Sequence, residues 1–81
     1  MSFEELQRRL VLHLIVRVKS GELTERSLAR MTRVSQPHMH NVLKGKRSFS
    51  MHMADSILRE LRMDIFDLLD PAELLEWRRR Q

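Results

Sequence analysis

The sequence has no cysteine, and glycine and proline occur only twice each among its 81 residues. Without cysteine the chain can form no disulfide, no thiol nucleophile and no zinc site built on thiolates. Glycine and proline interrupt helices most strongly, whereas the abundant leucine, methionine, arginine and glutamate favour them. The composition therefore predicts an all-α protein, and the length predicts one domain, residues 1–81, with a thin core.

A long apolar run is also missing. The most apolar segment, residues 10–16, is interrupted by His13 and is far shorter than the roughly 20 residues that a membrane-spanning helix needs. Arg8 and Arg9 precede it, as basic residues precede the apolar part of a signal peptide, but no small-residue cleavage site follows. These features predict a cytoplasmic protein with no membrane partner.

Motifs that support catalysis are absent from the sequence as well. It contains no nucleophile elbow, no phosphate-binding loop and no acid pair, so we expect no enzymatic activity and no cofactor. His38, His40 and His52 could suggest a metal site. However, His38 and His40 are two residues apart on a predicted helix and point in different directions, and no carboxylate lies near them in sequence. We therefore expect no metal and expect these two histidines to contact a base or a phosphate.

Acidic residues are missing from one central segment. Residues 26–54 contain six basic residues and no aspartate or glutamate, whereas the rest of the chain holds nine basic and eleven acidic residues. The net charge of +4 therefore comes from this segment. A basic region on a nearly neutral body is typical of a protein that binds a polyanion such as nucleic acid. On charge alone, the alternative is a solvated surface that is basic by chance.

Helix starts are marked by side chains that can accept hydrogen bonds from the first free N–H groups of a helix. The predicted caps are Ser2, Thr24, Ser35 or Gln36, Ser50, Asp64 and Asp70. Ser2 is reinforced by Glu5 in a capping-box pattern, and Asp70 by Pro71 and Glu73. The chain is therefore expected to form five or six helices joined by short turns.

Apolar residues recur in these helices at helical spacing. After Ser35 the apolar side consists of Met39, Val42 and Leu43, and Gly45 ends the helix, as Gly21 ends the first one. The helix after Ser50 carries a one-sided stripe of Met51, Ala54, Ile57, Leu58 and Leu61. Methionines on these helices are expected to fill the core, with Met53 the most exposed of them.

Two of the predicted helices form a helix-turn-helix pattern over about residues 24–44. Small Ala29 stands where the two helices would cross, and a short break follows at residues 32–34, with Val34 apolar enough to pack beneath it. The second helix, about residues 36–43, is apolar on one side only. Such a pair holds its second helix at an angle that lets it enter the major groove of DNA.

The outward side of this second helix carries residue types that read DNA. Glutamine and asparagine amides bind adenine, histidine can donate to guanine or to phosphate, and basic side chains suit backbone phosphates. The predicted base-reading residues are Gln36, Pro37, His38, His40 and Asn41. The predicted phosphate-binding residues are Thr24, Arg26, Ser35, Lys44, Lys46 and Arg47.

A series of short matches from residue 23 to residue 69 follows the order and spacing of one known family. They are Leu23-Thr24, Leu28-Ala29, Val34-Ser35-Gln36-Pro37, Met39 and Val42, Lys44-Gly45-Lys46-Arg47, Ser50-Met51 and Asp64-Ile65-Phe66-Asp67-Leu68-Leu69. The chain thereby resembles the lambda-repressor/Cro-type, or XRE-type, helix-turn-helix domain. The resemblance implies a lambda-repressor-like five-helix bundle that binds duplex DNA sequence-specifically, often as a dimer on a palindrome.

Two residues depart from the pattern of that family. Arg33 occupies a turn position that is usually glycine, where a left-handed backbone costs about 1 kcal/mol relative to glycine. Glu25 stands where the family commonly has a glutamine that contacts phosphate. A carboxylate facing the DNA would repel phosphate, and Arg26 can replace that contact.

The long apolar first helix and the last helix add to the minimal fold. Leu74, Leu75 and Trp77 of the last helix either pack against surplus apolar residues of the first helix or help to pair two protomers. Arg78, Arg79 and Arg80 form either a frayed helix end favoured by the helix dipole or a second DNA contact.

Together these features predict a small bacterial or phage transcriptional regulator. It would bind an inverted repeat in double-stranded DNA as a homodimer formed through the first helix, the last helix or both. The alternative is a protein-interaction module, such as an antitoxin or an adaptor, that uses the same fold to hold a partner protein. The polar outward side of the second motif helix favours DNA, because an adaptor is expected to show apolar or acidic side chains there.

Overall fold

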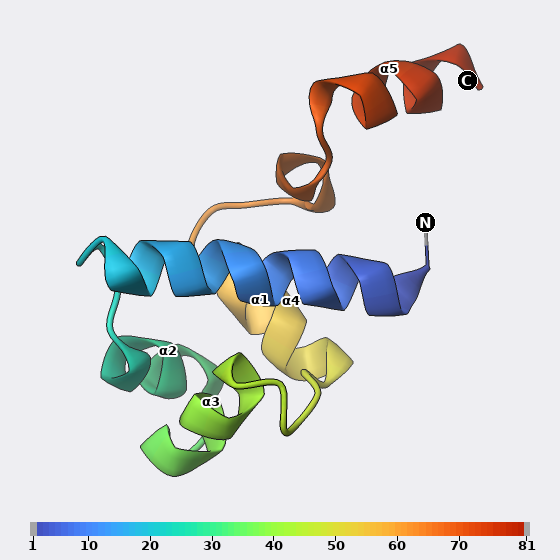
Figure 1. The fold of residues 1–81 in the computed structure, drawn as a ribbon. Coiled ribbons are helices and arrows are strands. Elements are labelled where there is room, and N and C mark those ends of the chain that lie inside the picture. Colours follow the sequence, from blue (N-terminus) through green and yellow to red (C-terminus); the bar gives the residue numbers. More distant parts are fainter. Residues whose placement is uncertain (1, 81) are drawn as a thin grey trace.

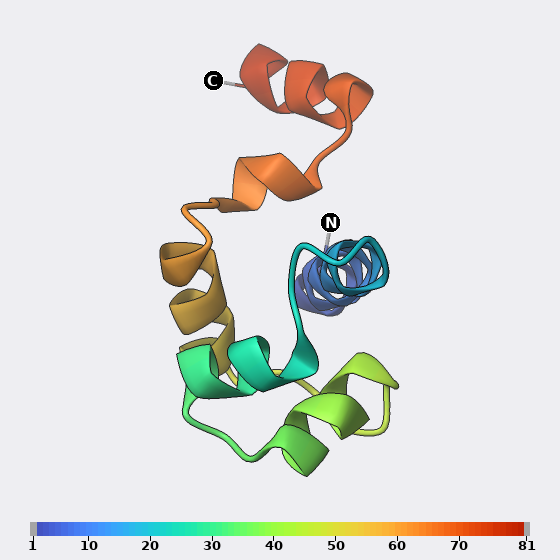
Figure 2. The same cartoon turned by 90° about the vertical axis from the view of Figure 1, so that its left-hand side faces the viewer.

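The computed structural model describes residues 2–80, and these residues are all-α. Without any β-strand in this range, they form five α-helices and one 3-10 helix: α1 Phe3–Lys19, α2 Glu25–Thr32, α3 Gln36–Leu43, α4 Met51–Glu60, η1 Ile65–Leu68 and α5 Pro71–Arg79. α1 lies between α2 and α3 at one end of the molecule and η1 and α5 at the other (Figures 1 and 2). The all-α class and the number of helices expected from the sequence are thus confirmed.

All six helices begin at the residues that the sequence predicts. Each cap accepts a hydrogen bond of 2.8–3.2 Å from an N–H group in the first turn, and the caps are Ser2, Thr24, Ser35, Ser50, Asp64 and Asp70. Ser35, rather than Gln36, is the cap of α3. In place of the return bond predicted from Glu5 to Ser2, the Glu5 carboxylate accepts hydrogen bonds from Arg8 and Arg9.

Left-handed backbone follows several of the helices. Gly21 has φ +89° after α1, and Gly45 has φ +81° after α3, in keeping with their predicted positions. Arg33 ends α2 with φ +59°, so the left-handed conformation expected at this non-glycine position is confirmed. Arg62, with φ +54°, adopts the same conformation after α4, and the sequence did not predict it.

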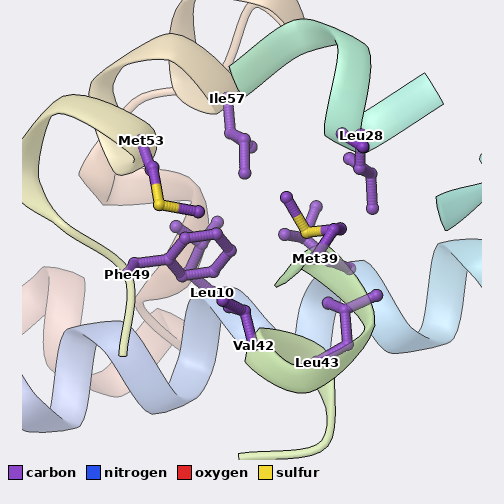
Figure 3. Packing of buried hydrophobic residues seen from close by; sticks show 10 residues of the cluster. Leu10, Leu28, Met39, Val42, Leu43, Phe49, Met53 and Ile57 are labelled. Atoms are coloured by element: carbon purple, nitrogen blue, oxygen red, sulfur yellow. The ribbon is translucent and has the colours of Figure 1, made fainter. Parts of the chain in front are cut away.

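The core lies between α1, α2, α3 and α4 and includes a residue of the loop before α4 (Figure 3). Its buried apolar side chains are Leu10, Leu14, Leu28, Ala29, Met39, Val42, Leu43, Phe49, Met53 and Ile57. Met39 and Val42 are completely buried, and Leu43 lies beside them, which confirms the predicted apolar side of α3. In Figure 3, Leu28 from α2 and Ile57 from α4 point toward Met39.

The prediction for two of the methionines was wrong. Met53 is buried, whereas Met51, which was expected in the apolar stripe of α4, is exposed. Met51 is the first residue of α4 after the Ser50 cap, so it lies at the edge of the core. Met53 precedes Ile57 by one turn and shares its side of the helix. The rest of the predicted stripe, Ala54, Leu58 and Leu61, is partly buried against the core.

α5 projects away from α1 and contains no buried residue (Figures 1 and 2). Leu75 is 54% exposed and Trp77 43% exposed, and Leu12 and Val16 on α1 are exposed as well. Of the two alternatives for the last helix, packing against the surplus apolar residues of α1 was therefore wrong for Leu75 and Trp77, whereas Leu74 is half-buried. Trp77 instead meets Phe66 of η1 edge-on, with 4.9 Å between the ring centres.

An arginine of α1 ties η1 and α5 to the rest of the fold. Arg9 donates to both carboxylate oxygens of Glu73, to the carbonyl oxygen of Leu68 at 3.2 Å and to the Glu5 carboxylate at 3.2 Å. The hydrogen bonds from Arg9 lower the pKa of Glu73 from the ordinary 4.5 to about 2, and the N–H of Asp70 adds to this effect. An ionised pair therefore holds the first turn of α5 against α1 at neutral pH.

The attachment of α5 should weaken in acid. Because the folded-state pKa of Glu73, about 2, lies below the ordinary 4.5, the pair contributes fully above pH 4.5 and is lost as the pH falls toward 2. Glu73→Gln, which keeps an acceptor for the Asp70 N–H, should lower the urea midpoint of Trp77 fluorescence at neutral pH and make no difference near pH 2. Glu76→Gln is the control, since Glu76 pairs with the exposed Arg80 at 3.7 Å. A Glu73→Gln effect of equal size at both pH values would contradict this role.

Shortening the buried side of α3 should destabilise the fold. Met39→Ala removes a completely buried side chain and should lower the free energy of unfolding by about 2–5 kcal/mol. Gln36→Ala, on the exposed side of the same helix, should change it by about 0.5 kcal/mol or less. Urea denaturation followed by circular dichroism measures both, and similar losses for the two variants would show that α3 is not anchored through Met39.

Candidate nucleic-acid interface

α2 and α3 are joined by a three-residue turn, residues 33–35. The N–H of Val34 donates to the carbonyl oxygen of Ala29 at 3.1 Å, and the Val34 side chain packs against the core, as predicted. Ser35 begins α3 immediately, because its hydroxyl accepts a hydrogen bond from the His38 N–H. The turn therefore fixes α3 beside α2 at the end of the molecule opposite α5 (Figure 2).

The outward side of α3 presents a row of polar side chains. Gln36, His40 and Lys44 follow one another at intervals of one turn, and all three are exposed. Pro37 is exposed beside this row, and Asn41 is half-buried. These residues lie opposite the buried Met39, Val42 and Leu43. The side of α3 expected to read bases is thus free of the core.

An open hollow on this side brings four of the five predicted base-reading residues together with one acid. It is lined by Gln36, Pro37, His40, Asn41 and Glu25. The Glu25 carboxylate oxygens lie 3.0 and 3.2 Å from Nδ1 of His40. His38, the fifth predicted base-reading residue, is half-buried and does not line the hollow.

Exposed cations lie on and next to the helix pair: Arg26, Arg30, Arg33, Lys44, Lys46 and Arg47. Within residues 2–80 none of these six forms an ion pair with a carboxylate, whereas four of the nine basic residues elsewhere do. The N–H groups of Lys46 and Arg47 both donate to the carbonyl oxygen of Asn41, at 2.9 and 3.3 Å, which holds this basic turn at the end of α3. The helix pair therefore presents positive charge that the described chain leaves without a counter-charge.

The two predicted phosphate-binding hydroxyls both serve as helix caps. The Thr24 hydroxyl accepts from the Ser27 N–H at 3.0 Å, and the Ser35 hydroxyl from the His38 N–H at 3.2 Å. Each hydroxyl still has a proton that it can donate. Capping is therefore compatible with a phosphate bound at either helix N-terminus, where free N–H groups favour an anion.

Two features of this surface are not among the sequence predictions. The Glu25–His40 pair joins two helices across fifteen residues of sequence, and no local pattern marks it, although Glu25 departs from the glutamine expected in the family predicted from the sequence. Arg30 is absent from the predicted contacts, yet it follows Arg26 by one helical turn and is exposed like it. That four-residue spacing is a signal that could have identified Arg30.

Comparison of the chain with known protein families, with characterised proteins and with solved structures finds no match. In the described residues, no three metal-binding side chains are grouped so that they could hold a metal ion. No helix of this same range is long and apolar enough to cross a membrane. The family resemblance and the functional roles of the site residues therefore remain predictions.

Proposed function

We propose that this chain binds double-stranded DNA sequence-specifically through α2 and α3, as a small transcriptional regulator of the lambda-repressor type. The observation that carries the proposal is the exposed basic surface of the helix pair, whose six cations have no carboxylate partner within residues 2–80. A polyanion supplies the missing counter-charge. Each cation that replaces a condensed counterion on DNA contributes to affinity.

α3 carries the side chains that this function needs in the major groove. In a helix-turn-helix, the N-terminal residues of the second helix approach the base edges most closely. Gln36 lies in the first turn of α3 and its amide can bind adenine, while Lys44, two turns further on, suits a phosphate. Because Gln36 and Lys44 share the exposed row, both can face the same groove.

Glu25 is the acidic residue of this surface, and its charge is directed at α3. Its carboxylate lies 3.0 Å from the imidazole of His40, and its side chain is 29% exposed. A carboxylate held in this way is directed at the imidazole, but its negative charge still weakens the attraction of this surface for a phosphate. The proposed contact between Arg26 and the DNA backbone must therefore outweigh that repulsion.

Affinity for duplex DNA should fall steeply between roughly 50 and 200 mM salt, because each phosphate contact releases a counterion. Lys46→Ala and Arg47→Ala should each weaken binding to all sequences alike and lower the slope of log affinity against log salt by about one. Gel shifts with random-sequence duplexes at several salt concentrations measure this. Arg79→Ala is the matched control, because Arg79 is exposed on α5 at the opposite end of the molecule (Figure 2). Affinity that is insensitive to salt, or equally weakened by Arg79→Ala, would contradict the proposed interface.

A second copy of the chain is part of this proposal, because one α3 reaches too few base pairs for selective binding. The exposed apolar side chains of α1 and α5, Leu12, Val16, Leu75 and Trp77, do not cover one another within a chain. We propose that α5 of one copy covers α1 of the other. Two half-sites about 34 Å apart would then be bound at once.

Leu12→Glu and Leu75→Glu should each abolish the two-to-one complex on an inverted repeat and leave weak, salt-dependent binding of single copies. A charge placed in an apolar interface is costly when it has no partner. Analytical ultracentrifugation with a duplex containing both half-sites measures the stoichiometry. Met51→Glu, which changes an exposed apolar residue on α4, should leave it unchanged. A strict one-to-one complex of the unaltered chain would exclude the dimer.

A protein-interaction module is the second candidate function. It is favoured by the same exposed apolar side chains on α1 and α5, since a different protein could cover them. Gel shifts with random duplex DNA at low salt distinguish the two candidates. If the folded chain retards no duplex at low salt, the DNA-binding proposal fails and the interaction module is favoured.

A further inference from the structure

We propose that Glu25 is a positioning residue for His40, and that the pair makes the neutral imidazole of His40 a hydrogen-bond acceptor that selects adenine or cytosine at one base-pair position. This inference rests on the proposed DNA-binding function and specifies what one side chain of α3 reads. It is carried by the contact between the carboxylate of Glu25 and the imidazole of His40.

The contact defines which nitrogen of His40 carries hydrogen. Both carboxylate oxygens of Glu25 lie near Nδ1, at 3.0 and 3.2 Å, and an ionised carboxylate can only accept hydrogen bonds. Nδ1 must therefore be the protonated nitrogen. In a neutral ring the lone pair then lies on Nε2, at the edge of the imidazole that faces away from Glu25.

An acceptor at Nε2 distinguishes bases in the major groove. Adenine and cytosine each present an amino group there, whereas guanine presents O6 and N7, and thymine presents O4, all acceptors. A neutral His40 held by Glu25 therefore pairs with an amino group and meets a second acceptor at guanine or thymine. Without the carboxylate, the ring can take either tautomer and reads neither class well.

The surroundings of His40 support a defined role for the ring. It is 48% exposed, and the other residues lining its hollow, Gln36, Pro37 and Asn41, carry no charge. Lys44 lies one turn further along the exposed row of α3. Glu25 is thus the carboxylate that orients the ring, and the same negative charge repels DNA phosphates whatever the sequence. The pair should therefore raise selectivity and lower non-specific affinity.

The experiment begins with selection of a preferred duplex from randomised DNA at pH 8, using the unaltered chain. Glu25→Gln should then reduce base discrimination at a single position by about threefold to tenfold, the value of one hydrogen bond. The same variant should raise affinity for random duplex by about twofold to fivefold, because a negative charge is removed. Glu22→Gln, which changes an acid paired with Arg17 at 2.9 Å, should alter no base preference.

His40→Ala should lose discrimination at the same position as Glu25→Gln. Adding Glu25→Gln to His40→Ala should then change the base preference no further, because the carboxylate acts through the ring. Nitrogen NMR of the imidazole provides a readout that needs no DNA. It should show hydrogen on Nδ1 of His40 in the unaltered chain and a mixture of tautomers in Glu25→Gln.

The outcomes separate the two proposals. If the unaltered chain binds no duplex, the DNA-binding function fails and base selection by His40 fails with it. If the chain selects a site but Glu25→Gln changes neither the base preference nor the tautomer, this inference is overturned and DNA binding stands. A preference for guanine or thymine at the position that depends on His40 also overturns it.

Discussion

α3 has eight residues, and an isolated helix in water needs about 12–15 to persist. It forms because Met39, Val42 and Leu43 are buried among side chains of α1, α2 and α4 (Figure 3) and because Ser35 caps its first turn. The outward row of α3 keeps a fixed position through this burial together with the cap and the turn before it. The proposed reading surface therefore depends on the packing on the opposite side of the same helix.

The distribution of charge follows from how little of the chain is buried. The core uses one side of each of α1 to α4, and the polar sides remain in solvent. Around α2 and α3 those polar sides are basic, and like charges on so short a segment repel one another. A bound polyanion relieves this repulsion. The surface that costs the free chain some stability is thus the one that the proposed binding of DNA would stabilise most.

Local features of the fold could be predicted from the sequence, and contacts between distant residues could not. Ser35 and Asp70 cap the N–H groups of their own first turns, so their roles are readable from neighbouring residues. The apolar stripe of α4 was recognised but misplaced at its start, because whether Met51 or Met53 reaches the core depends on where other helices lie. At the candidate site, the helical spacing of the apolar residues in the sequence identified the outward row of α3. It could not identify Glu25 as the partner of His40, because the crossing of α2 and α3 brings these residues together.

α5 does not cover the apolar side of its own α1, contrary to one prediction from the sequence. The proposed dimer is based on the same exposed apolar side chains. Had α5 folded back on its own α1, the exposed apolar side chains of both helices would have been covered, and no apolar surface would remain there for a second copy. Instead, the Arg9–Glu73 ion pair and the edge contact of Trp77 hold α5. Both contacts leave the apolar side of α5 exposed, with Leu75 and Trp77 in solvent. The apolar side of a helix attached in this way is therefore open to the second copy that we propose.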